Sequence, residues 1–151
     1  SLTAALLLVA GAVGVTAITQ LAEVSAAADT LYEDGAAPLD DLSTARQANA
    51  SMRQRVLLHL AGPVAVKPAR EQQITELDAT VDEKLAAFGE DFDDAELLGR
   101  YEAALADYRE FRDGTILPAS RAMDPAVPVA PILAECDRLY GIVSDLGAQL
   151  S

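Results

Sequence analysis

Several residue types that carry common kinds of chemistry are scarce in this chain. It has one cysteine, Cys136, so no internal disulfide can form, and one histidine, His59, so a helical di-iron or zinc site has too few ligands. There is no Gly-rich phosphate loop, and no nucleophile stands beside a histidine and a carboxylate. We therefore expect no enzyme, no metal and no cofactor, and we interpret Cys136 as a small hydrophobic residue.

Positive charge and aromatic rings are scarce as well. Lys and Arg number 11 against 24 Asp and Glu, and the net charge of -13 argues against nucleic acid as a partner, because phosphate binding requires clustered cations. Hydrophobic residues make up 51% of the chain but aromatics only 5%. A chain of 151 residues is about one domain long, and this Ala- and Leu-rich composition favours helices with many small apolar contacts.

The first part of the chain is uncharged. The run from Leu2 to Thr19 carries no charge, and about 18 to 20 such residues can cross most of the hydrocarbon core of a bilayer. We expect residues 1–19 to be the C-terminal part of a transmembrane helix. A cleaved signal peptide is the alternative, since Ala26 and Ala28 resemble a cleavage site, although its apolar region is shorter, about 7 to 15 residues.

The charges that follow this run indicate on which side of the membrane the remainder lies. Every charged residue from Glu23 to Asp41 is negative, and the first cation is Arg46. Segments retained in the cytoplasm are rich in Lys and Arg next to the membrane. We therefore expect residues 20–151 to form an extracytoplasmic domain, periplasmic or extracellular, attached to the cell membrane by the N-terminal helix.

Four helical segments are separated by residues that interrupt helices. The first continues from the apolar run, with a bend at Gly35 to Pro38, and ends at Gly62 and Pro63. The second spans Ala69 to Phe88, the third begins at Asp93 or Asp94 and closes around Pro118, and the fourth follows residues 124–131 and runs to the end. Segments of similar length with short connections predict an all-α fold, an antiparallel up-down four-helix bundle.

Buried faces are predicted from steps of three and four residues. The first segment has a seam that is mostly small and partly polar: Leu42, Ala45, Asn49, Met52, Val56 and His59. The other three segments carry apolar stripes: Ile74, Leu77, Val81, Leu85 and Phe88; Leu98, Tyr101, Leu105 and Tyr108; Ile132, Cys136, Leu139, Val143, Leu146 and Leu150.

The order of these segments resembles the four-helix-bundle sensor (ligand-binding) domain of methyl-accepting chemotaxis proteins and related bacterial transmembrane receptors. The resemblance rests on the apolar run leading into LYEDGAAPLDDL (31–42), then ARQANASMRQRVLLHLAG (45–62) and YEAALADYREFR (101–112). It implies a homodimer formed through the first helix, with small anions such as amino acids or organic acids bound at the dimer interface by arginines of that helix. Arg46 and Arg53 stand at the matching positions, whereas Arg55 points elsewhere.

The chemistry of these arginines gives a second reason to consider them. Arg46 and Arg53 are seven residues apart, so they share one face of a helix, and a guanidinium grips a carboxylate with two parallel hydrogen bonds. With Asn49 between them, they are predicted to clamp a small anionic ligand at the membrane-distal part of the dimer interface. The alternatives are that both arginines pair with acids of neighbouring helices, and that Asn49 sets dimer register.

Other polar residues are given structural roles. We expect His59 to be a partly exposed helix residue, and Tyr101 and Tyr108 to pack in the core with their hydroxyls reaching its edge. Arg109 and Arg112 are a candidate second cationic patch, although acidic residues surround them.

Two classes of function are compatible with these features. The first is a chemoreceptor sensory domain, in which a small ligand or a partner shifts helices and the shift crosses the membrane. The same module could serve a histidine kinase or a diguanylate cyclase. The second is a membrane-anchored structural or protein-binding helical bundle without a small-molecule ligand.

Overall fold

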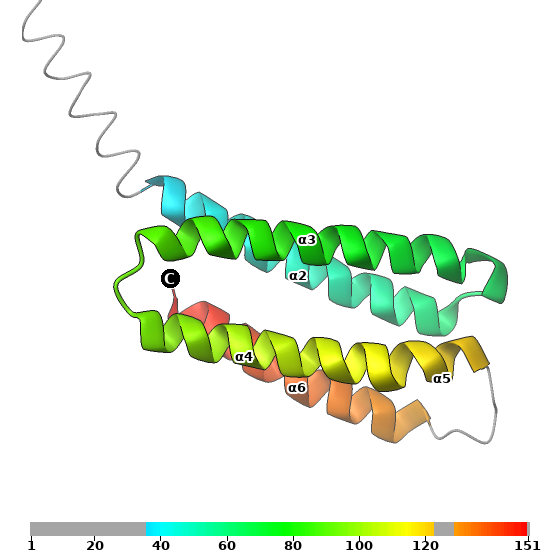
Figure 1. The fold of residues 1–151 in the computed structure, drawn as a ribbon. Coiled ribbons are helices and arrows are strands. Elements are labelled where there is room, and N and C mark those ends of the chain that lie inside the picture. The colour runs from blue at the N-terminus through cyan, green and yellow to red at the C-terminus, as the bar shows by residue number, and fades with distance from the viewer. Residues whose placement is uncertain (1–35, 123–128, 151) are drawn as a thin grey trace, which may run out of the picture. The chain divides into compact units, whose positions relative to one another are not determined.

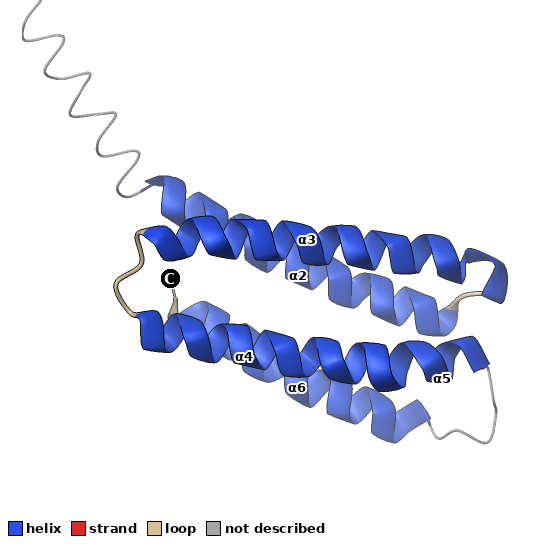
Figure 2. Cartoon of the chain, viewed as in Figure 1, coloured by secondary structure: helices blue, strands red, loops and turns tan. Residues whose placement is uncertain are grey.

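The computed structural model describes residues 36–122 and 129–150. The chain divides into two compact units, Ser1–Ala37 and Pro38–Ser151, and the bundle occupies the second. Among the described residues nearly all are helical and none lies in a strand, which confirms the predicted all-α bundle (Figure 2). The predicted membrane segment, residues 1–19, lies outside the described residues. Within the described ranges, no helix is both long and apolar enough to span a membrane.

The helices form two pairs that lie side by side (Figure 1). The elements in chain order are α2 (Ala37–Ala61), the 3-10 turn η2 (Val64–Val66), α3 (Lys67–Glu90), α4 (Ala95–Phe111), the π-helical turn η3 (Arg112–Ile116), α5 (Leu117–Ala122) and α6 (Val129–Gln149). Helix α2 lies beside α3, and α4 lies beside α6 (Figure 1). Helix α6 ends at the same end of the bundle at which α2 begins (Figure 1).

The helix boundaries follow the expected signals. Helix α2 ends at Ala61, directly before Gly62 and Pro63, as predicted. A Cβ at Gly62 would collide with the guanidinium of Arg70, which donates to the carbonyl of Leu58 and so caps the last turn of α2. Asp94 caps α4, because its Oδ1 accepts a hydrogen bond of 2.9 Å from the Leu97 N–H.

The predicted end of the third helical segment near Pro118 is wrong. The helix continues to Ala122, because the turn before the proline widens into the π-helical η3, where the N–H of Leu117 bonds back to the carbonyl of Arg112. Pro118 then falls in the first turn of α5, where a missing N–H is tolerated. The extra turns bring Ser120 and Arg121 to the end of the bundle.

The predicted seams form the core. All six seam residues of α2 are buried, and most of the apolar stripes are buried with them. The remaining stripe residues are partly buried and pack against this core: Leu77, Leu98, Ile132 and Leu139. Ile116 and Leu117, in the continuation past the predicted helix end, complete it.

Arg109 and Arg112 do not form a cationic patch, because acids of α3 and η3 pair with them. Arg112 is only 3% exposed, and its Nη1 and Nη2 donate to the two carboxylate oxygens of Asp78 at 2.9 and 2.7 Å. Its Nε donates to Asp113 at 2.8 Å. Arg109 donates to Asp82 at 2.7 Å. These contacts join α3 to α4 and η3.

Removing the Asp78 carboxylate should destabilise the bundle more than removing the neighbouring Asp82. Asp78→Ala leaves the buried Arg112 with Asp113 alone, and a broken buried ion pair costs roughly 3 kcal/mol at the lower end of its range. Asp82, whose side chain is 61% exposed, should cost less than about 1 kcal/mol as alanine. Urea denaturation of both variants measures the two values, and equal values would contradict the role given to Asp78.

Candidate functional site

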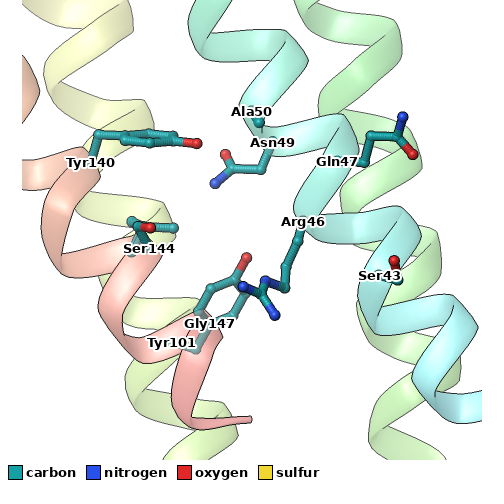
Figure 3. A pocket seen from close by; sticks show the side chains of 10 residues that line it. Ser43, Arg46, Gln47, Asn49, Ala50, Tyr101, Tyr140, Ser144 and Gly147 are labelled. Carbon is teal, nitrogen blue, oxygen red and sulfur yellow. The ribbon is translucent and has the colours of Figure 1, made fainter. Parts of the chain in front are cut away.

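Two of the three predicted ligand-binding residues line one pocket. Arg46 and Asn49 of α2 face Tyr101 of α4 and the inner side of α6 across a cavity of about 380 Å³ (Figure 3). The other lining residues are Ser43, Gln47, Ala50, Tyr140, Val143, Ser144 and Gly147. This volume lies within the range of small-molecule sites, about 300 to 1,000 Å³.

Small residues keep this pocket open. Ser43 and Ala50 on α2 and Ser144 and Gly147 on α6 leave space between the two helices. A Cβ at Gly147 would lie 3.1 Å from Cε2 of Tyr101, closer than most such contacts, and 3.8 Å from the aliphatic part of Arg46, an ordinary contact distance. A glycine at this position therefore preserves room beside the Tyr101 ring.

Two buried polar atoms at the pocket have no hydrogen-bond partner among the described residues, namely Asn49 Oδ1 and Tyr101 Oη. Asn49 is 4% exposed and Tyr101 1%. A buried polar atom left unpaired costs about 1 to 3 kcal/mol. Burial also raises the pKa of Tyr101, so its hydroxyl stays protonated and can donate. The prediction that the tyrosine hydroxyls reach the edge of the core is wrong for Tyr101, and also for Tyr108, which is fully buried.

Arg53, the third predicted residue, is held by α6 and does not line the pocket. Its Nη2 donates to Asp137 at 2.5 Å, and its guanidinium carbon lies 4.6 Å from the centre of the Tyr140 ring. The hydrogen bond to Asp137 raises the pKa of Arg53. Tyr140 is shared, because its ring also borders the pocket that Arg46 and Asn49 line. Arg53 thus fastens α2 to α6 next to the pocket.

His59 is fully buried, and the expectation that it is partly exposed is wrong. Its Nδ1 lies 2.9 Å from Ser120 Oγ, and its Nε2 lies 2.9 Å from Glu71 Oε1. These two partners come from α5 and α3, so the histidine joins three elements at one end of the bundle. Its place in the seam of α2, three residues after Val56 and seven after Met52, was the signal for its burial.

The partners of His59 were not predicted from the sequence. Lys67 is only 2% exposed, and its Nζ donates to both the backbone carbonyl and the hydroxyl oxygen of Ser120, the latter at 2.9 Å. Arg121 donates to both carboxylate oxygens of Glu71, at 2.8 and 2.9 Å. Burying a lysine is costly unless it is well hydrogen-bonded, as it is here. The cluster of His59, Lys67, Glu71, Ser120 and Arg121 has a structural role, because it joins α2, α3 and α5.

Metal chemistry receives no support from the described residues, where no group of three or more His, Cys, Asp or Glu side chains could hold an ion. Cys136 is fully buried with its Sγ 4.0 Å from Tyr108 Oη, and burial raises the pKa of its thiol. A buried thiol with a raised pKa is a poor nucleophile.

The chain matches the model of a family described as a four helix bundle sensory module for signal transduction, over residues 1–121. The chain belongs to this family. The predicted resemblance to a four-helix-bundle sensor domain is confirmed. Sensory modules of this family are signal-transduction domains and are not catalytic. The matched region includes α2 and its predicted arginines but ends before α6. Neither a curated protein nor a solved structure matches the chain.

Low pH should destabilise the cluster of His59, Lys67, Glu71, Ser120 and Arg121 by protonating the Glu71 carboxylate. Its hydrogen bonds, to Arg121 above all and then to His59, lower its pKa from 4.5 to about 2. A carboxyl whose pKa falls on folding stabilises the protein fully above about pH 4.5, and this stabilisation is lost as the pH falls towards 2. Glu71→Gln should lower the melting temperature at pH 6 and flatten its decline between pH 4.5 and 2.

Thermal melts of this variant across that pH range test the assignment. Glu76→Gln is the matched control, because Glu76 is exposed and, among the hydrogen bonds described, its carboxylate accepts only from Gln72 of its own helix. Its profile should follow that of the unmodified chain. A Glu71→Gln profile parallel to the unmodified one would remove Glu71 as the titrating group.

Proposed function

We propose that this sensory module is the extracytoplasmic domain of a bacterial transmembrane chemoreceptor, and that it binds a small anionic ligand through Arg46 and Asn49. Its family membership supports signalling as the general role. The apolar run at residues 1–19 and the acidic flank up to Asp41 support a membrane anchor with the bundle outside the cytoplasm. A histidine kinase or diguanylate cyclase could use the same module as its sensor.

The observation that carries the ligand proposal is the pocket beside Arg46. Although the chain is strongly acidic, this pocket is lined by a guanidinium and by no carboxylate, which favours an anion. Asn49 contributes a buried amide on the same wall. In this proposal Arg53 has a different part from the clamp first predicted: it holds Asp137 and Tyr140, and thereby α6, against α2.

We also propose that the module dimerises through α2. An exposed stripe follows steps of three and four along this helix and is mostly small or uncharged: Leu39, Ser43, Gln47, Ala50, Gln54 and Leu58. Leu39 and Leu58 are 55% and 37% exposed, and such apolar residues gain from a partner helix. Two α2 helices packed along this stripe would form a parallel homodimer with the pocket opening at its interface, because Ser43, Gln47 and Ala50 also line the pocket.

A ligand of this site should stabilise the folded chain. A compound that binds only the folded form adds about 2.7 kcal/mol at a hundredfold excess over its dissociation constant, or about 5 to 10 °C in melting temperature for a domain of this size. Amino acids, dicarboxylates and other organic anions should be screened. At least one should raise the melting temperature, and Arg46→Ala should abolish that rise.

Arg55→Ala is the matched control for this screen. Arg55 lies on the same helix but borders a separate depression against α3. Its alanine variant should keep the full ligand response that Arg46→Ala loses, and the melting temperature of each unliganded variant is the reference for its own ligand response. Ligand responses that persist in Arg46→Ala would place the site elsewhere.

Cysteine crosslinking tests the dimer. Single cysteines at positions 43, 47, 50 and 54 should form disulfides between chains in membranes, because these positions share the exposed stripe of α2. Positions 45, 52 and 56 should not, because their side chains are buried in the bundle of one chain. The native cysteine is replaced by serine in all variants. Equal crosslinking at both sets of positions would exclude a specific α2 interface.

A further inference from the structure

One aromatic ring closes the pocket at the end nearest Arg53. Tyr140 lines the pocket, and the centre of its ring lies 4.6 Å from the guanidinium carbon of Arg53. Arg53 does not line the pocket, although it stands only about one helical turn from Asn49, which does. Figure 3 shows the Tyr140 ring edge-on, with its hydroxyl directed from α6 towards α2. The ring therefore separates the pocket from the Arg53 guanidinium.

Contacts from two other helices fix the position of this ring. Arg53 of α2 lies over the ring and is itself held at 2.5 Å by Asp137, three residues before Tyr140 on α6. Tyr108 of α4 meets the ring in a T-shaped arrangement, with 5.8 Å between the ring centres and 66° between the ring planes. A cation over an aromatic face and an edge-to-face aromatic pair are both attractive, and both depend on orientation. These contacts hold the ring where it ends the pocket.

Without the ring, the two arginines on this face of α2 would border one space. Arg46 and Arg53 are two helical turns apart, roughly 10 Å at about 1.5 Å per residue. Of these two, Arg46 lines the pocket and Arg53 lies behind the ring. With alanine at position 140, the volume of the phenol ring would be added to the pocket in the direction of Arg53. The side chain at this position therefore sets the length of the pocket.

We propose that Tyr140 limits the length of the molecule that the pocket accepts, and that Arg53 is a positioning residue that acts through the Tyr140 ring. The inference rests on the proposed function and concerns the selectivity of the same site. A molecule that is too long for the space in front of the ring is rejected, because the ring cannot move aside without losing its contacts with Arg53 and Tyr108. Arg53 thus shapes the pocket without binding the molecule inside it.

Isothermal titration calorimetry of the 151-residue chain with straight-chain α,ω-dicarboxylates of three to eight carbons tests the proposal. The end groups and the charge are the same throughout this series, so the series measures length. The unmodified chain should bind a short member at least tenfold more tightly than the longest members. Tyr140→Ala should bind the longer members at least tenfold more tightly than the unmodified chain does.

Two variants are matched controls for Tyr140→Ala. Tyr140→Phe keeps the ring and should keep the length preference of the unmodified chain. Ile142→Ala removes an exposed apolar side chain of the same helix, away from the pocket, and should also keep that preference.

Arg53→Gln distinguishes positioning from a purely structural role. This substitution removes the cation over the ring, so the longer dicarboxylates should gain affinity severalfold while the short ones bind nearly as before. In the Tyr140→Ala background the same substitution should have the opposite effect, because Arg53 then faces the longer molecule directly. A loss of helix packing alone would weaken short and long members alike in both backgrounds, and that result would overturn the positioning role.

The remaining outcomes separate this inference from the proposed function. The same length preference in the unmodified chain and in Tyr140→Ala, with binding that depends on Arg46, would overturn the role of Tyr140 and leave the anion site standing. If no dicarboxylate binds to either chain, the inference fails, while the broader screen with Arg46→Ala decides the proposed function separately. Should Tyr140→Ala not fold, as judged by circular dichroism, Tyr140→Leu takes its place, because leucine leaves an apolar wall that is shorter than a phenol ring.

Discussion

Polar contacts between the two helix pairs hold the bundle together, and they lie from its middle towards the turn that joins α2 to α3. Arg112 with Asp78, Arg53 with Asp137, and the cluster around Ser120 all connect the α2–α3 pair to α4, η3, α5 or α6. The core contains three buried aromatic residues, Phe88, Tyr101 and Tyr108, and most of its other members are Ala, Leu, Ile and Val, whose contacts have little direction. Directional, charge-assisted hydrogen bonds therefore set the register between the pairs.

Two cavities lie between the helix pairs. The pocket beside Arg46 lies between α2 and α6, and a second cavity of about 440 Å³ lies between α3 and α4. Both are between the two helix pairs rather than within either pair. Sites that must open to admit a ligand belong in regions with fewer fixed contacts. The cavity between α3 and α4 is bordered by the Arg109–Asp82 ion pair, whereas no acidic residue lines the pocket beside Arg46.

Local patterns predicted the helices and most of the core, while polar partners could not be predicted. Steps of three and four residues placed Asn49 and His59 on the buried face of α2, because periodicity depends only on neighbouring residues. The partner of Arg53 is 84 residues away and that of Lys67 is 53 residues away. In a chain with 24 acidic residues, nothing local distinguishes Asp137 from the other candidates.

The position of Arg53 gives α2 a pivot. This residue holds α2 to α6, and at about 1.5 Å per residue Arg46 lies roughly 10 Å from it along the helix and Leu39 roughly 21 Å. Under the proposed function, a tilt of α2 about Arg53 would move Leu39 about twice as far as Arg46. Because Asp41 pairs with Lys84 of α3 at 2.8 Å, the same tilt would carry the C-terminal half of α3 with the start of α2.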